Sequence, residues 1–138
     1  MNVNDRMYEC AKIASNLSGV DARILYAQWS HESTDIREDS PTRGQPFMSE
    51  LAQDNCNYGG VTQEEPNDSP QPDGQYYYMY FGSPEAYAIY FGRYLRYYPG
   101  PKRTIEEYAT VLKDGGYFGD TLENYISGVS RAYEEAFL

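Results

Sequence analysis

The feature that most constrains the fold is an apolar helical segment, residues 21–33, with a carboxylate on its core-facing side. Leu25, Trp29 and Glu32 recur at steps of four and three, so at about 3.6 residues per turn they share one stripe of the helix. An acid on such a stripe either has a partner or keeps its proton, because burial disfavours the charged form and raises the pKa. The sequence therefore predicts a core helix whose Glu32 has the properties of a general acid.

The position of Glu32 near the expected end of this helix allows a second interpretation. A half-exposed carboxylate there would accept hydrogen bonds from the following turn and have no catalytic role. Two later segments bear on the choice, NYGGVTQEE at residues 57–65 and GGYFGDTLENYI at residues 115–126. Together with AQWSHES at residues 27–33 they form an ordered set of motifs.

This set resembles the motifs of the glucosaminidase family, glycoside hydrolase family 73, in the lysozyme-like superfamily. In that family a helix with the approximate pattern AQxxxES supplies the catalytic acid. An NxFGI element then leads into a β-hairpin with a second acidic residue, and a YATDxxY element closes the domain. The first pattern is matched at residues 27–33, the second loosely at 57–61, and the third in part at 117–125. The resemblance spans residues 8–130 and implies a bacterial or phage peptidoglycan hydrolase.

The resemblance also implies roles for individual residues. Glu32 would donate a proton to a β-1,4 glycosidic oxygen, as in an endo-β-N-acetylglucosaminidase. A second carboxylate on the hairpin would balance the oxocarbenium-like charge, and Glu65 and Glu64 are the candidates, ahead of Asp68. Neighbours on a strand point to opposite faces, so only one of the two glutamates should face the groove. The candidates for substrate binding are Tyr117, Tyr125, Asn57, Gln63 and Gln28.

Two other functions stay open. An N-acetylated sugar can supply its own nucleophile, and lytic transglycosylases work with one catalytic glutamate, so Glu32 alone would suffice for a lytic transglycosylase or a muramidase. GVTQ at residues 60–63 partly resembles the GLMQ segment of the transglycosylases. The chain could instead be a catalytically weak wall-binding domain, or a structural domain of a phage or secretion particle, because the hairpin motif departs from the family pattern.

The charge and composition limit the partners. With 21 acidic and 11 basic residues the net charge is −10, which argues against nucleic acid and anionic membrane surfaces. The 16 tyrosines suit a groove for polar, ring-shaped ligands such as sugars, although we expect at least half of them to pack in the core and at its rim. No cluster of cysteine, histidine and acid has metal-ligand spacing, so we expect no metal and no cofactor. Peptidoglycan glycan strands are the expected partner.

The start of the chain has no signal-peptide pattern, and no stretch approaches the roughly 20 apolar residues of a membrane span. We therefore expect a protein that reaches the cell wall within a larger polypeptide, in a particle or through lysis. The sequence leaves open whether Cys10 and Cys56 form a disulfide. His31 is expected at the surface.

The expected architecture is one α+β domain over residues 1–138, predominantly helical and lysozyme-like, with a small β-hairpin lobe at about 58–82. Caps and apolar periodicity predict five main helices near residues 5–18, 21–33, 84–98, 104–115 and 120–137, with a short helix at 49–54. The hairpin would pair residues 59–65 with 75–81. The aromatic stripe of the 84–98 helix is expected in the core, and the polar segment 34–48 reads as a loop that either lines the groove or is a plain insertion.

Overall fold

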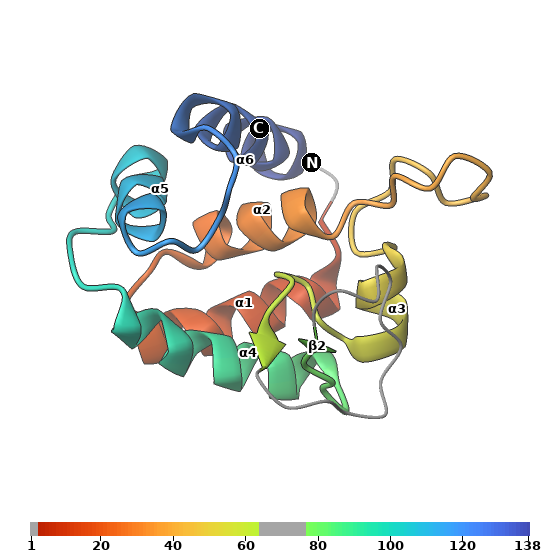
Figure 1. Ribbon diagram of the computed structural model, residues 1–138, viewed down its shortest axis with the longest axis horizontal. Helices are drawn as coiled ribbons and strands as arrows, with labels where there is room; N and C mark the ends of the chain where they lie inside the picture. Colours follow the sequence, from red (N-terminus) through yellow and green to blue (C-terminus); the bar gives the residue numbers. More distant parts are fainter. Residues whose placement is uncertain (1–2, 64–76) are drawn as a thin grey trace. The chain divides into compact units, whose positions relative to one another are not determined.

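The computed structural model describes residues 3–63 and 77–138, which form a predominantly helical fold with one short two-stranded sheet (Figure 1). The chain divides into two compact units. Residues 1–28 and 88–138 make up the first, here called the terminal unit, and residues 29–87 make up the middle unit. The boundaries fall inside two helices, α2 (Ala22–Glu32) and α4 (Pro84–Tyr94).

The first helix, α1 (Asp5–Ser18), begins and ends where the sequence predicts. The Asn4 side chain accepts a hydrogen bond of 3.1 Å from the backbone N–H of Met7 and so caps the N-terminus. Gly19 ends the helix at a φ of 80°, a left-handed conformation that favours glycine, and its N–H donates to the Ser15 carbonyl oxygen. The periodicity of Met7, Cys10, Ala11, Ala14 and Leu17 predicts the buried face, and the first four of these residues are buried whereas Leu17 is half-buried.

The second helix, α2, is buried on nearly every side. None of the residues from 24 to 30 is more than 8% exposed. Two hydroxyls satisfy carbonyl groups of the last turn, since Ser33 donates to the Trp29 carbonyl oxygen at 2.6 Å and Thr34 donates to that of Ser30 at 2.7 Å. The expected core helix is therefore confirmed, and its apolar environment extends beyond the predicted stripe.

The terminal unit also contains the end of α4, the 3-10 helix η1 (Leu95–Tyr97), α5 (Ile105–Asp114) and α6 (Leu122–Phe137). Helices α5 and α6 contact each other directly. Thr104 caps α5 and Thr121 caps α6, each by accepting a 3.1 Å hydrogen bond from a backbone N–H three residues later. The predicted 84–98 helix instead ends in a 3-10 turn, because the proline at position 99 disfavours a helical conformation at Tyr98.

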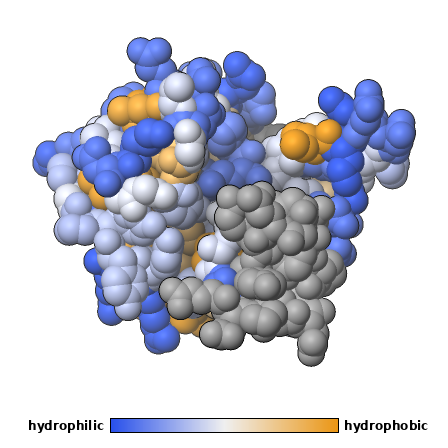
Figure 2. All heavy atoms as spheres, in the orientation of Figure 1, coloured by the Kyte–Doolittle hydropathy of each residue, from blue (hydrophilic) through white to orange (hydrophobic). Residues whose placement is uncertain are grey.

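In the middle unit a loop leaves α2, runs outward and returns to α3 (Glu50–Asn55) (Figure 1). Figure 2 shows mostly hydrophilic residues over this loop, at the right of the view. The hairpin consists of β1 (Thr62–Gln63) and β2 (Tyr77–Tyr78), antiparallel, with Thr62 opposite Tyr78. Both strands lie inside the predicted ranges, 59–65 and 75–81. Within the described residues each strand is shorter than its predicted range. The chain after β2 turns to another partner, since Phe81 N–H donates to the Asn55 carbonyl oxygen at 2.8 Å.

An aromatic cluster forms the core of the middle unit. The rings of Trp29, Tyr58 and Phe81 surround Tyr87 with centroid separations of 5.2, 5.2 and 5.3 Å, all in edge-to-face geometry. These four side chains come from α2, the segment before β1, the segment after β2, and α4. Trp29 is fully buried, so its truncation would cost about 3–5 kcal/mol of stability.

The helical class and the presence of a hairpin are confirmed; the lysozyme-like arrangement and the single domain stay predictions. Among the described residues, no helix combines the length and apolarity that crossing a membrane requires. Neither Cys10 nor Cys56 forms a disulfide. His31 is half-buried and so less exposed than predicted.

Replacement of Gly92 tests the packing of α4 on α1. A Cβ at this position would lie 3.0 Å from the Ala14 Cα and carbonyl oxygen and 2.9 Å from the Leu17 Cβ. Alanine in an open helix gains up to about 1 kcal/mol over glycine. Here backbone atoms would have to move, so we expect Gly92→Ala to lower the free energy of unfolding by about 1–3 kcal/mol in urea titrations.

Gly82→Ala is the matched control, because a Cβ at Gly82 meets nothing within 4 Å. Its free energy of unfolding should stay within about 0.5 kcal/mol of that of the wild type. A Gly92→Ala variant as stable as this control would contradict the close contact of α1 with α4.

Candidate active site

Glu32 lines a cavity of about 350 Å³ in the middle unit, here called the Glu32 cavity. It is the last residue of α2 and is half-buried. The walls come from the end of α2, the loop after it, the start of α3, and the hairpin: Glu32, Thr34, Asp35, Ile36, Arg37, Ser49, Glu50, Leu51, Asn57, Gly60 and Tyr78. Glu32 and Asn57, which belong to two separate motifs of the sequence, thus meet in one cavity.

Asn57 holds the turn that leads into the hairpin. Its amide nitrogen donates to the carbonyl oxygens of Val61 at 2.9 Å and Met79 at 3.0 Å, and its amide oxygen accepts from Val61 N–H at 3.1 Å. Both amide hydrogens are therefore in use. Gly60, inside this turn, has a φ of 64°, which favours glycine. Asn57 shapes the wall of the cavity by fixing this backbone.

The loop 34–48 is organised by a buried carboxylate, Asp35, whose side chain is 0% exposed. It accepts hydrogen bonds from Arg37 Nε at 3.0 Å and Nη2 at 3.2 Å, from the Arg37 backbone N–H, and from the hydroxyls of Ser40 and Thr42. The Arg37 guanidinium, followed by the two hydroxyls, holds the pKa of Asp35 far below its usual range. Asp35 is thus a structural anion and holds no proton to donate at neutral pH.

The same loop is also closed by its backbone. Asp35 N–H donates to the Gln45 carbonyl oxygen at 3.0 Å, and Gly44 N–H donates to the Asp35 carbonyl oxygen at 2.7 Å. The segment is therefore an ordered structure that lines the Glu32 cavity. The sequence allows two interpretations of this loop, a lining of the groove or a plain insertion. The structure favours the first, because residues of the loop line the Glu32 cavity.

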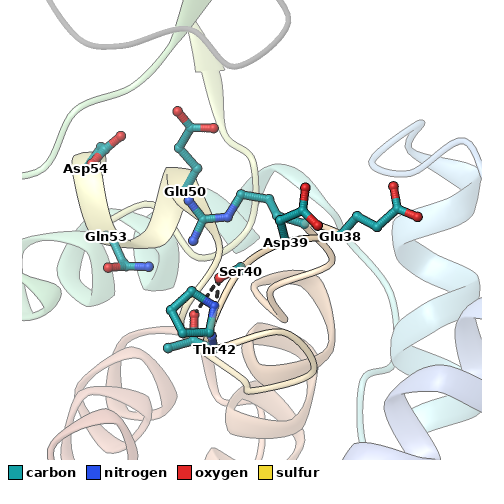
Figure 3. Close-up of a pocket in the computed structure, with 9 residues that line it drawn as sticks. Glu38, Asp39, Ser40, Thr42, Glu50, Gln53 and Asp54 are labelled. Carbon is teal, nitrogen blue, oxygen red and sulfur yellow. Dashed lines mark hydrogen bonds between the residues drawn. The ribbon is translucent and has the colours of Figure 1, made fainter.

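A second, more open cavity of about 630 Å³ lies between the loop and α3 (Figure 3). The loop contributes Glu38 and Asp39, and α3 contributes Glu50 and Asp54, so four carboxylates surround it. Glu50 and Arg37 line both this cavity and the Glu32 cavity. Glu50 is a second acid in the wall of the Glu32 cavity that the motifs do not indicate, because in the sequence it reads as an ordinary acid in the first turn of a helix.

Gln28 and Tyr125, both predicted to bind substrate, pack in the terminal unit. Gln28 Nε2 donates to the Tyr125 hydroxyl at 3.1 Å, and the Tyr108 hydroxyl donates to Gln28 Oε1 at 2.6 Å. Gln28 is 0% exposed and Tyr125 4%, and Tyr125 stacks on Phe118 at 3.8 Å. This burial leaves the two side chains little surface for a substrate, and it gives both a structural role.

The other predicted residues have different settings. Tyr117 is half-buried in the terminal unit, where its ring lies 6.0–6.3 Å from those of Phe91, Tyr94 and Tyr98. Gln63 is half-buried in β1 and pairs with Tyr77. The three hairpin acids, Glu64, Glu65 and Asp68, lie outside the described residues, so their roles stay predictions.

Within the described ranges, no group of three or more histidine, cysteine, aspartate or glutamate residues has the geometry to hold a metal ion. Comparison of the chain with protein-family models, curated proteins and solved structures finds no match. The residues themselves are thus the basis for a functional assignment.

The low pKa of Asp35 predicts how the loop responds to acid. Because the folded pKa lies below the unfolded value of about 3.9, the carboxylate stabilises the fold above that value and loses this contribution as the pH falls toward its folded pKa. We expect Asp35→Asn to be less stable than the wild type in urea at pH 7. The gap should stay constant down to about pH 5 and shrink below about pH 4.

Asp39→Asn is the matched control, since Asp39 is an exposed acid of the same loop. Its free energy of unfolding should follow that of the wild type across this pH range. A gap between Asp35→Asn and the wild type that does not change between pH 5 and pH 3 would contradict an ionised, buried Asp35.

Proposed function

We propose that the chain is a peptidoglycan hydrolase that cleaves a β-1,4 glycosidic bond of the glycan strand, with endo-β-N-acetylglucosaminidase activity and Glu32 as the general acid. The observation that carries the proposal is the Glu32 cavity, where Glu32 lies with Asn57 and Gly60. The motif resemblance predicts that these two segments cooperate, and their sharing of one cavity supports it. The volume of about 350 Å³ is within the range of small-ligand sites.

In this proposal the carboxylic acid of Glu32 gives its proton to the leaving glycosidic oxygen as the bond to the anomeric carbon breaks. The sugar ring then carries positive charge, which a carboxylate on the opposite side stabilises or captures. Water adds to the anomeric carbon and gives its proton to a carboxylate of the site, which completes the hydrolysis. Asp35 is unsuited to this second role, because Arg37 and two hydroxyls already engage its oxygens. Glu64 and Glu65 keep the role implied by the resemblance, and Glu50 joins them as a lining residue of the cavity.

The site of action under this proposal is the bacterial cell wall. Two alternatives give different products. A lytic transglycosylase would use Glu32 alone and leave an anhydro sugar, whereas a muramidase would cut the other of the two alternating bonds. A catalytically weak wall-binding or structural domain would release neither product.

Replacement of Glu32 tests the assignment of the acid. Because glutamine cannot donate the proton, we expect Glu32→Gln to reduce clearing of purified peptidoglycan by at least about 100-fold. Glu38→Gln is the matched control, since it removes the same charge from the neighbouring open cavity without touching the Glu32 cavity. Mass spectrometry of the products from the wild type identifies the bond that is cut. Activity retained in Glu32→Gln would overturn the assignment.

The second carboxylate is tested with Glu64→Gln, Glu65→Gln and Glu50→Gln. Alternation along a strand predicts that one hairpin variant stays near wild-type activity while the other is badly impaired. Impairment of Glu50→Gln alone would assign the role to α3. If all three variants stay active, the reaction needs no second protein carboxylate, and an anhydro product would then identify a transglycosylase.

A further inference from the structure

A third cavity, of about 540 Å³, lies on the terminal unit and is lined by Tyr90, Arg93, Tyr94, Arg96 and Tyr97. We call it the Tyr–Arg cavity. Tyr90, Arg93, Tyr94 and Tyr97 follow one another at steps of three, one and three, so they share one face of the α4–η1 run. The sequence predicts a core role for the aromatic stripe of this helix. Tyr87, Phe91, Leu95 and Tyr98 confirm it, whereas Tyr90 and Tyr94 of the same stripe are half-buried and line the cavity. Tyr97, which is not part of that stripe, is 81% exposed.

The aromatic rings of the cavity are ordered by the packing beneath them. Tyr90 and Tyr94 stack with an interplanar angle of 18° at 6.0 Å, and the Tyr94 hydroxyl shares a 2.8 Å hydrogen bond with that of Tyr98. Tyr98 lies over Gly115, where even a Cβ would come within 2.4 Å of its ring. Tyr117, one of the predicted sugar-binding residues, packs against Tyr94 from within the same cluster. The cavity thus offers preformed aromatic faces beside an exposed ring.

The charge of the cavity is opposite to that of the chain. Among the described residues, its charged lining residues are Arg93 and Arg96 and none is a carboxylate, although the chain carries 21 acids against 11 basic residues. Neither arginine forms an ion pair with a described residue. By contrast, the Glu32 cavity, the open cavity beside α3 and a cavity at the start of α5 all include glutamates. This face therefore suits a ligand with both rings and negative charge.

Burial raises the pKa of Tyr90 and Tyr94, with the Tyr98 hydrogen bond adding to the effect at Tyr94. Both phenols therefore stay neutral at physiological pH, and the formal charges that the described lining residues contribute are positive. Aromatic faces pack against the apolar faces of pyranose rings, and the planar guanidinium binds carboxylates in bidentate fashion. Nucleic acid also has rings and anions, but a net charge of −10 opposes the approach of a polyanion with a phosphate at every unit.

We propose that the Tyr–Arg cavity is a binding site for carboxylate-bearing sugars of the peptidoglycan strand, formed by residues other than those of the Glu32 cavity. The identification of the ligand as a glycan rests on the proposed function. The stacked rings, and the two arginines that form no ion pair with a described residue, are observations independent of that function. In such a strand the carboxylates sit on alternate sugars, as lactyl or stem-peptide groups. A neutral sugar ring would pack on Tyr97, and the adjacent carboxylate would bind Arg93 or Arg96.

The experiment measures binding to insoluble peptidoglycan by co-sedimentation of the full chain, with Glu32→Gln in every protein so that the polymer stays intact. We expect Tyr97→Ala to weaken binding roughly 3- to 10-fold. The double variant Arg93→Gln/Arg96→Gln should weaken binding to peptidoglycan at least as much, while its binding to chitin, which has the same N-acetylated sugar without carboxylates, should stay unchanged. Tyr97→Ala should weaken binding to both polymers.

Tyr80→Ala and Arg43→Gln/Arg131→Gln are the matched controls, because they remove an exposed tyrosine and two exposed arginines that lie outside the cavity. Equal binding by the cavity variants and these controls would overturn the proposal. Loss of binding to single-stranded DNA in the cavity variants, with peptidoglycan binding unchanged, would overturn it in favour of a polyanion site.

The outcome is separable from that of the proposed function. If the wild-type chain cleaves peptidoglycan and the cavity variants bind normally, the hydrolase assignment stands and the glycan site falls. If the wild type cleaves nothing while the cavity variants lose binding, the Tyr–Arg cavity is a glycan-binding site and the protein binds the wall without hydrolysing it.

Discussion

The structure depends on helix α2, whose central residues, 24 to 30, have almost no contact with water. With every residue from 24 to 30 buried, partners for the polar groups of α2 have to come from the protein, and a buried polar group left unsatisfied costs about 1–3 kcal/mol. Gln28 has its partners in Tyr108 on α5 and Tyr125 on α6. The hydroxyls of Ser33 and Thr34 satisfy carbonyl groups of the last turn. The bonds of Ser33 and Thr34 hold the last turn of α2, which carries Glu32.

The requirement that buried polar groups have partners also shapes the middle unit, where the buried group is the charged carboxylate of Asp35. A carboxylate as buried as Asp35 is tolerated only with strong partners, and it gathers them from one stretch of the loop. The outcome is a folded loop whose Arg37 is fixed at the wall of the Glu32 cavity. Any polar substrate there meets an arginine whose orientation is set before binding, which lowers the entropic cost of using it.

The features that could be predicted from the sequence are those with local causes. Asn4, Gly19, Ser49 and Thr104 act through backbone groups within four residues, and they cap the helices that the sequence predicts near 5–18, 49–54 and 104–115. The features that sequence reasoning missed depend on distant partners. Nothing near Gln28 in the sequence indicates Tyr108 or Tyr125, so a buried amide reads as a substrate ligand. Glu50 enters the Glu32 cavity only because the loop returns the chain to α3. The catalytic role of the hairpin acids, Glu64, Glu65 and Asp68, rests on the motif resemblance alone.

Charge connects the two proposed sites to one mode of action. A chain with a net charge of −10 is repelled by an anionic polymer at distances up to the Debye length, about 8 Å at physiological ionic strength. The proposed association with a cell wall would then depend on short-range contacts that work inside this distance. The Tyr–Arg cavity would provide them, because ring packing is insensitive to salt and neither arginine forms an ion pair within the described part of the chain. Binding strength would thus come from one surface and bond cleavage from another, so that Glu32 could be kept in an acidic cavity that binds anionic sugars poorly by itself.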